Sequence, residues 1–130
     1  MMMDVEGKIV IGSLKGNVYG VGKDLVAAVL ESAGFKVVDL GVDVSPEAFV
    51  DSAVEEKADV IAISISTDES IPFLKGVMEI LCKRNLRNAI KVVVGGKAVS
   101  EKTRKEYGVD AYARDARDCV KKIQALLARA

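Results

Sequence analysis

The sequence predicts an α/β fold: a parallel sheet of five strands in the order 2-1-3-4-5, with helices on both faces. Short β-branched runs alternate with amphipathic helical stretches, which is typical of parallel sheets. Two of the runs, 59–64 and 91–95, have continuously apolar centres, as expected for strands covered on both faces. The length of 130 residues suits one domain with a substantial core. We therefore expect a single domain over 1–130, with a loose start at 1–6.

The strands are expected where β-branched residues gather between turn residues. Right-handed crossovers between parallel strands leave few topologies, and a flavodoxin-like (Rossmann-like) sheet fits best. The fifth run is the weakest. The expected strands are 8–12, 35–40, 59–64, 91–95 and 111–113.

The helices are expected from caps and apolar spacing. The first, around Leu25 to Ser32, ends before Gly34, which suits the position after a helix terminus. The second begins at Ser45-Pro46-Glu47, an N-cap followed by proline and an acid. Its inward residues are expected to be Phe49, Ala53 and Val54. The third begins at 70–72, the fourth is capped by Ser100 and ends near 107–108, and the fifth has an inner stripe of Ala116, Val120, Ile123 and Leu127.

The composition excludes several chemistries. The chain has no histidine, which removes the commonest general base and metal ligand. Cys82 and Cys119 lie 37 residues apart, so no zinc or thioredoxin-type pair exists, and both are expected to be packing residues on helices. Nineteen basic residues balance nineteen acidic ones, which argues against binding nucleic acid or a membrane through bulk charge. The first residues do not resemble a signal peptide, so we expect a cytoplasmic protein.

A ligand site is expected beyond the carboxyl ends of the strands, where open parallel sheets bind ligands. The segments that follow four of the strands, at 13–23, 64–70, 95–98 and 114–115, are rich in glycine, hydroxyl or charged residues. Glycine there lets a ligand approach the backbone closely. The spacing of the first segment fits neither a P-loop nor GxGxxG. A phosphoacceptor site and a flavin site also lack their residues.

The chain resembles the cobalamin (vitamin B12)-binding domain of methionine synthase, of corrinoid proteins of methyltransferase systems and of B12-dependent mutases. The family motif is DxHxxG, followed by SxL and then GG. Here Asn17 to Gly22 stands at the first part of the motif. Residues 23–63, 41 in number, separate it from Ser64-Ile-Ser66, and residues 67–94, 28 in number, separate Ser66 from Gly95-Gly96. Similar surroundings occur at 34–47 and 112–116, so the resemblance covers about residues 8–128.

The resemblance implies a corrin ring over the carboxyl edge of the sheet, with its nucleotide tail in a crevice between sheet and helices. Gly22, Gly95 and Gly96 correspond to positions that make room for the tail. Ser64 corresponds to the hydroxyl that hydrogen-bonds the base of the tail. The cofactor-binding residues expected on this basis are Asn17, Tyr19, Gly20, Gly22, Ser64, Ser66, Gly95, Gly96, Tyr112 and Ala113.

The sequence departs from the family where the protein would ligate cobalt. Tyr19 replaces the histidine that binds cobalt from below, and Asn17 replaces its aspartate partner. Cobalamin could bind with its own base still on cobalt, or with the base in the crevice and cobalt without a protein ligand, or the site could take another ligand. A tyrosine hydroxyl is a poor cobalt ligand at neutral pH, and we expect Tyr19 to pack beneath the ring.

The function expected is that of a corrinoid-binding protein that carries a cobamide to a partner enzyme, most simply in methyl transfer, without catalytic residues or a metal ligand of its own. Two alternatives stand beside it. One is the small cobalamin-binding subunit of a carbon-skeleton mutase. The other is a degenerate, non-catalytic sensor or scaffold of the same fold. The partner would be a methyltransferase or the large subunit of a mutase, and not a nucleic acid or a membrane.

Overall fold

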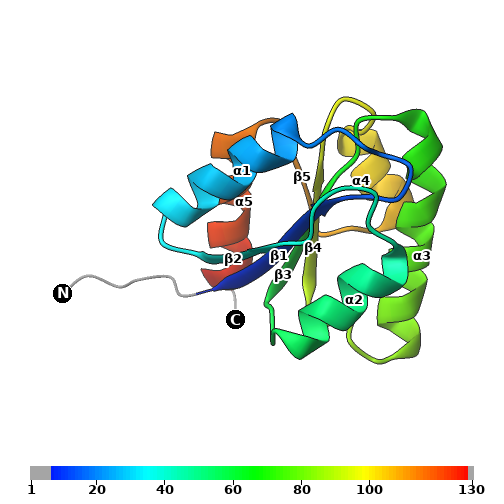
Figure 1. Cartoon of the computed structure of the whole chain (residues 1–130). Coiled ribbons are helices and arrows are strands. Elements are labelled where there is room, and N and C mark those ends of the chain that lie inside the picture. The colour runs from blue at the N-terminus through cyan, green and yellow to red at the C-terminus, as the bar shows by residue number, and fades with distance from the viewer. Residues whose placement is uncertain (1–6, 129–130) are drawn as a thin grey trace.

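Strands and helices alternate along the computed structural model, which describes residues 7–128 (Figure 1). The start expected to be loose, 1–6, lies outside this range. The strands are β1 (Lys8–Ser13), β2 (Lys36–Asp39), β3 (Val60–Ser64), β4 (Lys91–Gly95) and β5 (Ala111–Ala113). The helices are α1 (Val21–Ser32), α2 (Pro46–Glu55), α3 (Ile71–Lys83), α4 (Glu101–Tyr107) and α5 (Ala116–Ala128), and a short 3₁₀ turn, Asp68–Ser70, precedes α3.

The sheet has the predicted order, β2-β1-β3-β4-β5, with all neighbours parallel. Its register brings the ends of the central strands level. Ser13 pairs with Ser64, Ser64 with Gly95, and Gly95 with Ala113. The segments that follow β1, β3, β4 and β5 therefore begin side by side at one edge of the sheet.

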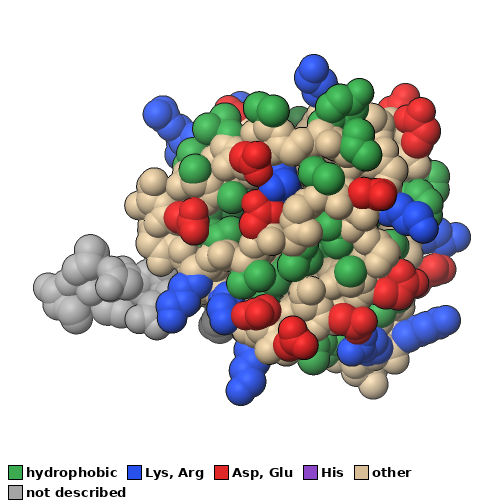
Figure 2. All heavy atoms as spheres, viewed as in Figure 1, with side chains coloured by type: hydrophobic (Ala, Val, Ile, Leu, Met, Phe, Trp, Pro, Cys, Tyr) green, Lys and Arg blue, Asp and Glu red, His purple; other side chains and the backbone are tan. Residues whose placement is uncertain are grey.

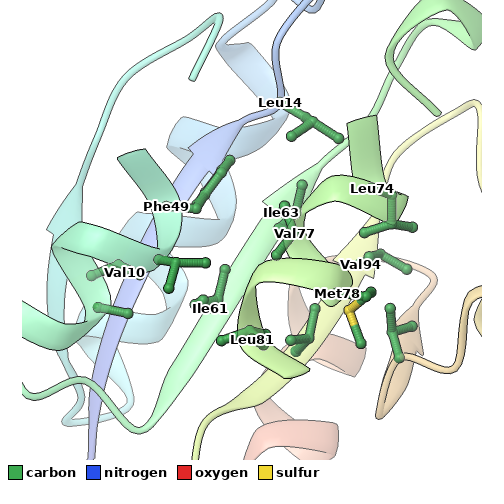
Figure 3. Packing of buried hydrophobic residues seen from close by; sticks show 14 of the residues in the cluster. Val10, Leu14, Phe49, Ile61, Ile63, Leu74, Val77, Met78, Leu81 and Val94 are labelled. Atoms are coloured by element: carbon green, nitrogen blue, oxygen red, sulfur yellow. The ribbon is translucent and has the colours of Figure 1, made fainter. Parts of the chain in front are cut away.

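Two hydrophobic cores cover the two faces of the sheet. The larger packs β1, β3 and β4 against α2 and α3, with Phe49, Leu74, Val77 and Leu81 fully buried (Figure 3). The smaller lies under α1 and α5 and includes Leu30 and Ile123. Figure 1 shows these two helices side by side, on the opposite side of the sheet from α2 and α3.

The predicted helix ends are confirmed in detail. The Ser45 hydroxyl accepts a hydrogen bond from the Ala48 backbone N–H at 3.1 Å, and Pro46 follows as the first helical residue. Ser100 and Thr103 form a reciprocal capping box at the start of α4. Gly34 follows α1 with a φ of 102°, a left-handed conformation that costs glycine little.

Some of the predicted inward faces are wrong. Val54 is 42% exposed, because the buried stripe of α2 runs through Phe49, Val50 and Ala53 instead. Cys82 is exposed on α3, whereas Cys119 is buried as expected. The inner face of α5 is centred on Ile123 and Cys119, and Ala116, Val120 and Leu127 flank it half-buried.

The surface carries acidic and basic side chains that alternate with hydrophobic ones over the face shown in Figure 2. Neither sign of charge dominates that face, in keeping with the equal numbers of acidic and basic residues. Among the described residues, no helix is both long and apolar enough to cross a membrane.

Candidate functional site

A crevice of about 760 Å³ opens at the carboxyl edge of the sheet, beneath α1 and α5. Its floor is formed by strands β1, β3 and β4, and its walls by the first turns of the two helices and the segments after β3, β4 and β5. Small residues line much of it, including Gly22, Ala62, Gly95, Ala113 and Ala116. The crevice thus lies at the edge of the sheet where the sequence predicts a ligand site.

Seven of the ten residues expected to bind a cofactor line this crevice. They are Tyr19, Gly22, Ser64, Ser66, Gly95, Gly96 and Ala113. The other three, Asn17, Gly20 and Tyr112, are not among the lining residues. Tyr112 packs against the core on the opposite face of the sheet, because successive strand residues point to opposite sides.

The three glycines that line the crevice differ in what a side chain at each position would meet. A Cβ on Gly22 would meet no atom within 4 Å, so this position in α1 borders open space. Gly96 has a φ of 120°, and a Cβ there would lie 2.2 Å from the carbonyl oxygen of Ile65. Gly96 is therefore required by its own backbone, independently of any ligand. A Cβ on Gly95 would lie 3.1 Å from the Ala113 carbonyl oxygen.

The Asn17 side chain holds the loop between β1 and α1 through two hydrogen bonds to the backbone. Its side chain is fully buried, its Oδ1 accepts from the Tyr19 N–H at 3.0 Å, and its Nδ2 donates to the Ser64 carbonyl at 3.2 Å. The Ser13 hydroxyl donates to the Tyr19 carbonyl at 2.8 Å. The backbone of Tyr19 is thus fixed at both its N–H and its C=O, while 64% of the residue is exposed.

Lys23 in the first turn of α1 is a buried cation in the crevice wall. Its Nζ donates to Asp39 at 2.7 and 2.8 Å and to Asp24 at 2.6 Å. Burial lowers the pKa of the Lys23 ammonium, but the hydrogen bonds and charges of Asp24 and Asp39 outweigh it and leave the pKa raised. Lys23 therefore ties the start of α1 to the end of β2.

The corner between β5 and α5 is held by a buried carboxylate. Asp118 accepts from the Arg114 backbone N–H at 3.0 Å, and Lys122 lies 3.4 Å away. The hydrogen bond from the Arg114 backbone, aided by the Lys122 charge, holds the Asp118 pKa below its ordinary value despite burial. Asp115 accepts from the Asp118 N–H at 2.8 Å. This network positions Arg114 and Asp115 at the crevice mouth.

Polarity changes along the crevice from its mouth inward. The hydroxyl residues Ser64, Ser66 and Thr67 lie near the mouth, whereas two residues earlier on the strands the lining is Ile11, Ala62 and Val93. Cys119 adds a thiol from α5. Burial, with the nearby Asp118 carboxylate, raises the pKa of this thiol to about 12, so it is protonated at neutral pH.

An apolar rim borders the crevice on the α1 side. It consists of Val18, Tyr19, Val21, Leu25 and Val42, each between 41% and 84% exposed. Among the described residues, only Val54 is another large hydrophobic residue exposed to this degree. Tyr19, Val21 and Leu25 also line the crevice itself. Clustered exposed apolar residues of this kind mark a binding surface.

Sequence reasoning placed Gly22 of α1 at the site and included Val21 and Lys23 within the segment 13–23, but it missed Leu25 and Val26. Val21, Leu25 and Val26 line the crevice, and Lys23 stands in its wall. The apolar spacing of this helix groups Leu25 with Ala28 and Val29, whereas the buried stripe of α1 runs through Ala27 and Leu30. Lys97 and Arg114, at the mouth, were included only within the segments expected at this edge.

The chain matches the family model of the B12 binding domain over residues 7–122. The match covers nearly all of the α/β domain described above, and the chain belongs to the B12 binding domain family. The resemblance inferred from the motif spacing is confirmed.

The relatives are corrinoid proteins. The chain is 38% identical over 122 residues to dimethylamine corrinoid protein 3 of Methanosarcina mazei, covering 94% of this chain and 73% of the relative. It is 31% identical to the monomethylamine corrinoid protein structure of Methanosarcina barkeri, with a TM-score of 0.88 over 94% of this chain and 58% of that one. The chain is 27% identical to the structure of the methanol:cobalamin methyltransferase complex MtaBC of the same organism. The TM-score is 0.89, and the match covers 95% of this chain and 47% of that one. The chain spans between 47% and 73% of the length of these three relatives.

Proposed function

We propose that this chain binds a corrinoid at the carboxyl edge of its sheet and carries it to a partner methyltransferase. The observation that carries the proposal is the juxtaposition of an open crevice walled by small residues with an exposed apolar rim. A corrinoid combines a broad, largely apolar ring with a long nucleotide appendage, and the rim and the crevice match these two parts. The names of the relatives, which are methylamine corrinoid proteins, favour methyl transfer over carbon-skeleton rearrangement.

The residues present fit such a cofactor. The rim would lie against one face of the ring, and the opening beside Gly22 would admit the tail. The Ser64 hydroxyl makes no hydrogen bond within residues 7–128, so it is free to donate to a ring nitrogen of the base. The bound corrinoid would supply a cobalt centre that accepts and donates a methyl group. The chain itself would hold the corrinoid, orient it and shelter part of it from water.

We further propose that the base of the tail lies in the crevice and that no protein side chain ligates cobalt. The absence of histidine from the sequence and the place of Tyr19 at the rim support this arrangement. An axial nitrogen donor stabilises higher oxidation states of a metal, so its loss favours the lower states of cobalt. Such a shift suits a methyl carrier that must accept the group again after each transfer.

Titration of the purified chain with cob(II)alamin tests the proposal. Binding should give a coloured protein that survives desalting, and its electron paramagnetic resonance spectrum should lack nitrogen superhyperfine coupling. A single clear nitrogen coupling would show that the cofactor keeps its own base on cobalt, and would overturn the arrangement proposed here. A protein that stays colourless would overturn corrinoid binding itself.

The substitution Gly22→Leu tests the placement of the tail. Its side chain would extend into the open space of the crevice, and we expect the affinity for cobalamin to fall at least ~100-fold. Leucine is favoured over glycine in a helix by about 1 kcal/mol, so the loss should occur without loss of folding. Ala28→Leu adds a similar side chain to the exposed side of the same helix and should leave binding intact. Equal affinities of the two variants would argue against this crevice.

A further inference from the structure

We infer that the deep end of the crevice selects cobamides by the polarity of their lower base, favouring a benzimidazole over a purine. The inference rests on the proposed function and specifies the ligand class of the same site. Natural corrinoids share the ring and differ in the base at the end of the nucleotide tail. If the tail enters the crevice, that base is the part that meets the innermost residues.

The innermost lining offers no partner for additional polar atoms. It consists of Ile11, Val26, Ala62, Val93 and Cys119. Val26 is half-buried, and each of the others is at most 4% exposed. The backbone groups of Ile11, Ala62 and Val93 lie within the hydrogen-bonded ladder of the sheet. Within residues 7–128, no buried side-chain nitrogen or oxygen lacks a hydrogen-bond partner. The Cys119 thiol is protonated and a weak donor.

The hydroxyl residues determine how many polar atoms of a bound base can find a hydrogen-bond partner in the crevice. Ser64 stands two residues beyond Ala62 on the same face of β3, at the boundary between the apolar end and the mouth. One hydroxyl at this place suits one ring nitrogen, which is what a dimethylbenzimidazole attached to its sugar presents. Adenine presents an exocyclic amine and further ring nitrogens, and these would enter the apolar end without partners.

The size of the preference follows from the cost of burying an unpaired polar group. One such group costs about 1–3 kcal/mol, so dimethylbenzimidazole cobamide should bind about 5-fold to 150-fold more tightly than the adenine form. Cobinamide, which lacks the nucleotide tail, should bind more weakly than the dimethylbenzimidazole form because it leaves the crevice unfilled.

The experiment is an absorbance titration of the chain with these three corrinoids in the cob(II) state. Equal or tighter binding of the adenine form would overturn the inference while leaving corrinoid binding in place. Cobinamide binding as tightly as dimethylbenzimidazole cobamide would also overturn it, because the tail would then contribute nothing. Failure to bind all three would instead overturn the proposed function, and the inference with it.

A matched pair of variants locates the preference. Val93→Thr places a hydroxyl at the deep end of the crevice, and should reduce the dimethylbenzimidazole-to-adenine affinity ratio at least ~5-fold, because it gives the purine a partner. Val92→Thr makes the same change one residue earlier, in the core on the opposite face of the sheet, and should leave the ratio unchanged. Because each ratio is measured within one variant, a modest loss of stability does not affect it. A ratio unchanged by Val93→Thr would overturn the assignment of the deep end.

Discussion

At the scale of single residues, the loop before α1 is organised to hold one position. The N–H and C=O of Tyr19 form hydrogen bonds with Asn17 and Ser13, although the residue as a whole is mostly exposed. The same asparagine ties the loop to the end of β3 through the Ser64 carbonyl. The backbone is therefore preorganised at the place where, by the family resemblance, a cobalt-ligating histidine would stand.

This geometry predicts that Tyr19→His introduces an axial ligand. The imidazole would be attached to a backbone already held from both sides, and a neutral imidazole is a common ligand of metals. The cob(II)alamin complex of the variant should show a single nitrogen superhyperfine coupling, and Tyr19→Phe should show none. With ¹⁵N-labelled protein the coupling should become that of ¹⁵N. A Tyr19→His spectrum identical to that of the unmodified protein would contradict the prediction.

Asp118 predicts a specific dependence of stability on pH. The Arg114 backbone N–H and the Lys122 charge lower its pKa below 3.8, so ionised Asp118 stabilises the folded state above pH 3.8. That contribution should disappear as the pH falls from 3.8 through the lower pKa of the folded state. Asp118→Asn should therefore be less stable than the unmodified protein at pH 6, with the difference shrinking below pH 3.8. Urea unfolding between pH 6 and pH 2.5 measures it, and a constant difference would contradict this role.

The residues of the site were predictable from sequence to different degrees. Strand ends predict Ser64 and Gly95, because parallel strands place their carboxyl ends at one edge. The motif resemblance places Asn17, Tyr112 and Ala113 at the site as well. The structure assigns Asn17 to the loop backbone and Tyr112 to the far face of the sheet. Motif spacing gives a position along the chain, whereas the direction of a side chain depends on local hydrogen bonds and on strand alternation.

At the scale of elements, the N-cap of α2 should make a measurable contribution to the free energy of unfolding. The Ser45 hydroxyl satisfies the Ala48 N–H at the start of α2, a group with no partner inside the helix. Ser45→Ala should lower the free energy of unfolding by about 1 kcal/mol, measured by urea denaturation. Ser45→Asp should retain most of the stability, since a carboxylate also caps and favours the helix N-terminus. Equal midpoints for the serine and alanine proteins would show that water replaces the cap.

Helix faces were less predictable than helix ends. At 100° per residue, Ala53 lies about 40° from Phe49 around α2, whereas Val54 lies about 140° from it, which explains why Val54 is exposed. On α1, apolar spacing does not distinguish a residue that faces the core from one that faces a ligand. Leu25 is 60% exposed and lines the crevice, while Ala27 and Leu30 face the sheet.

At the scale of the whole molecule, binding of a ligand should raise the thermal stability of the folded chain. A ligand that binds only the folded state stabilises it by about 2.7 kcal/mol at a hundred times its dissociation constant. Cobalamin should therefore raise the melting temperature in proportion to the logarithm of its concentration. Gly22→Leu should melt at or above the temperature of the unmodified protein and show no such rise. A cobalamin-dependent rise in this variant would place the ligand elsewhere.

The order and direction of the strands were fully predictable, because alternation, apolar runs and right-handed crossovers leave few arrangements. The size and lining of the crevice were not, since they depend on how far α1 and α5 stand from the edge of the sheet.

The larger hydrophobic core lies on the face of the sheet away from the crevice, between the strands and α2 and α3. The larger core of the fold is therefore separated in space from the proposed corrinoid site. Synthesis in a vitamin-free medium should yield a compact, colourless protein that can be charged afterwards.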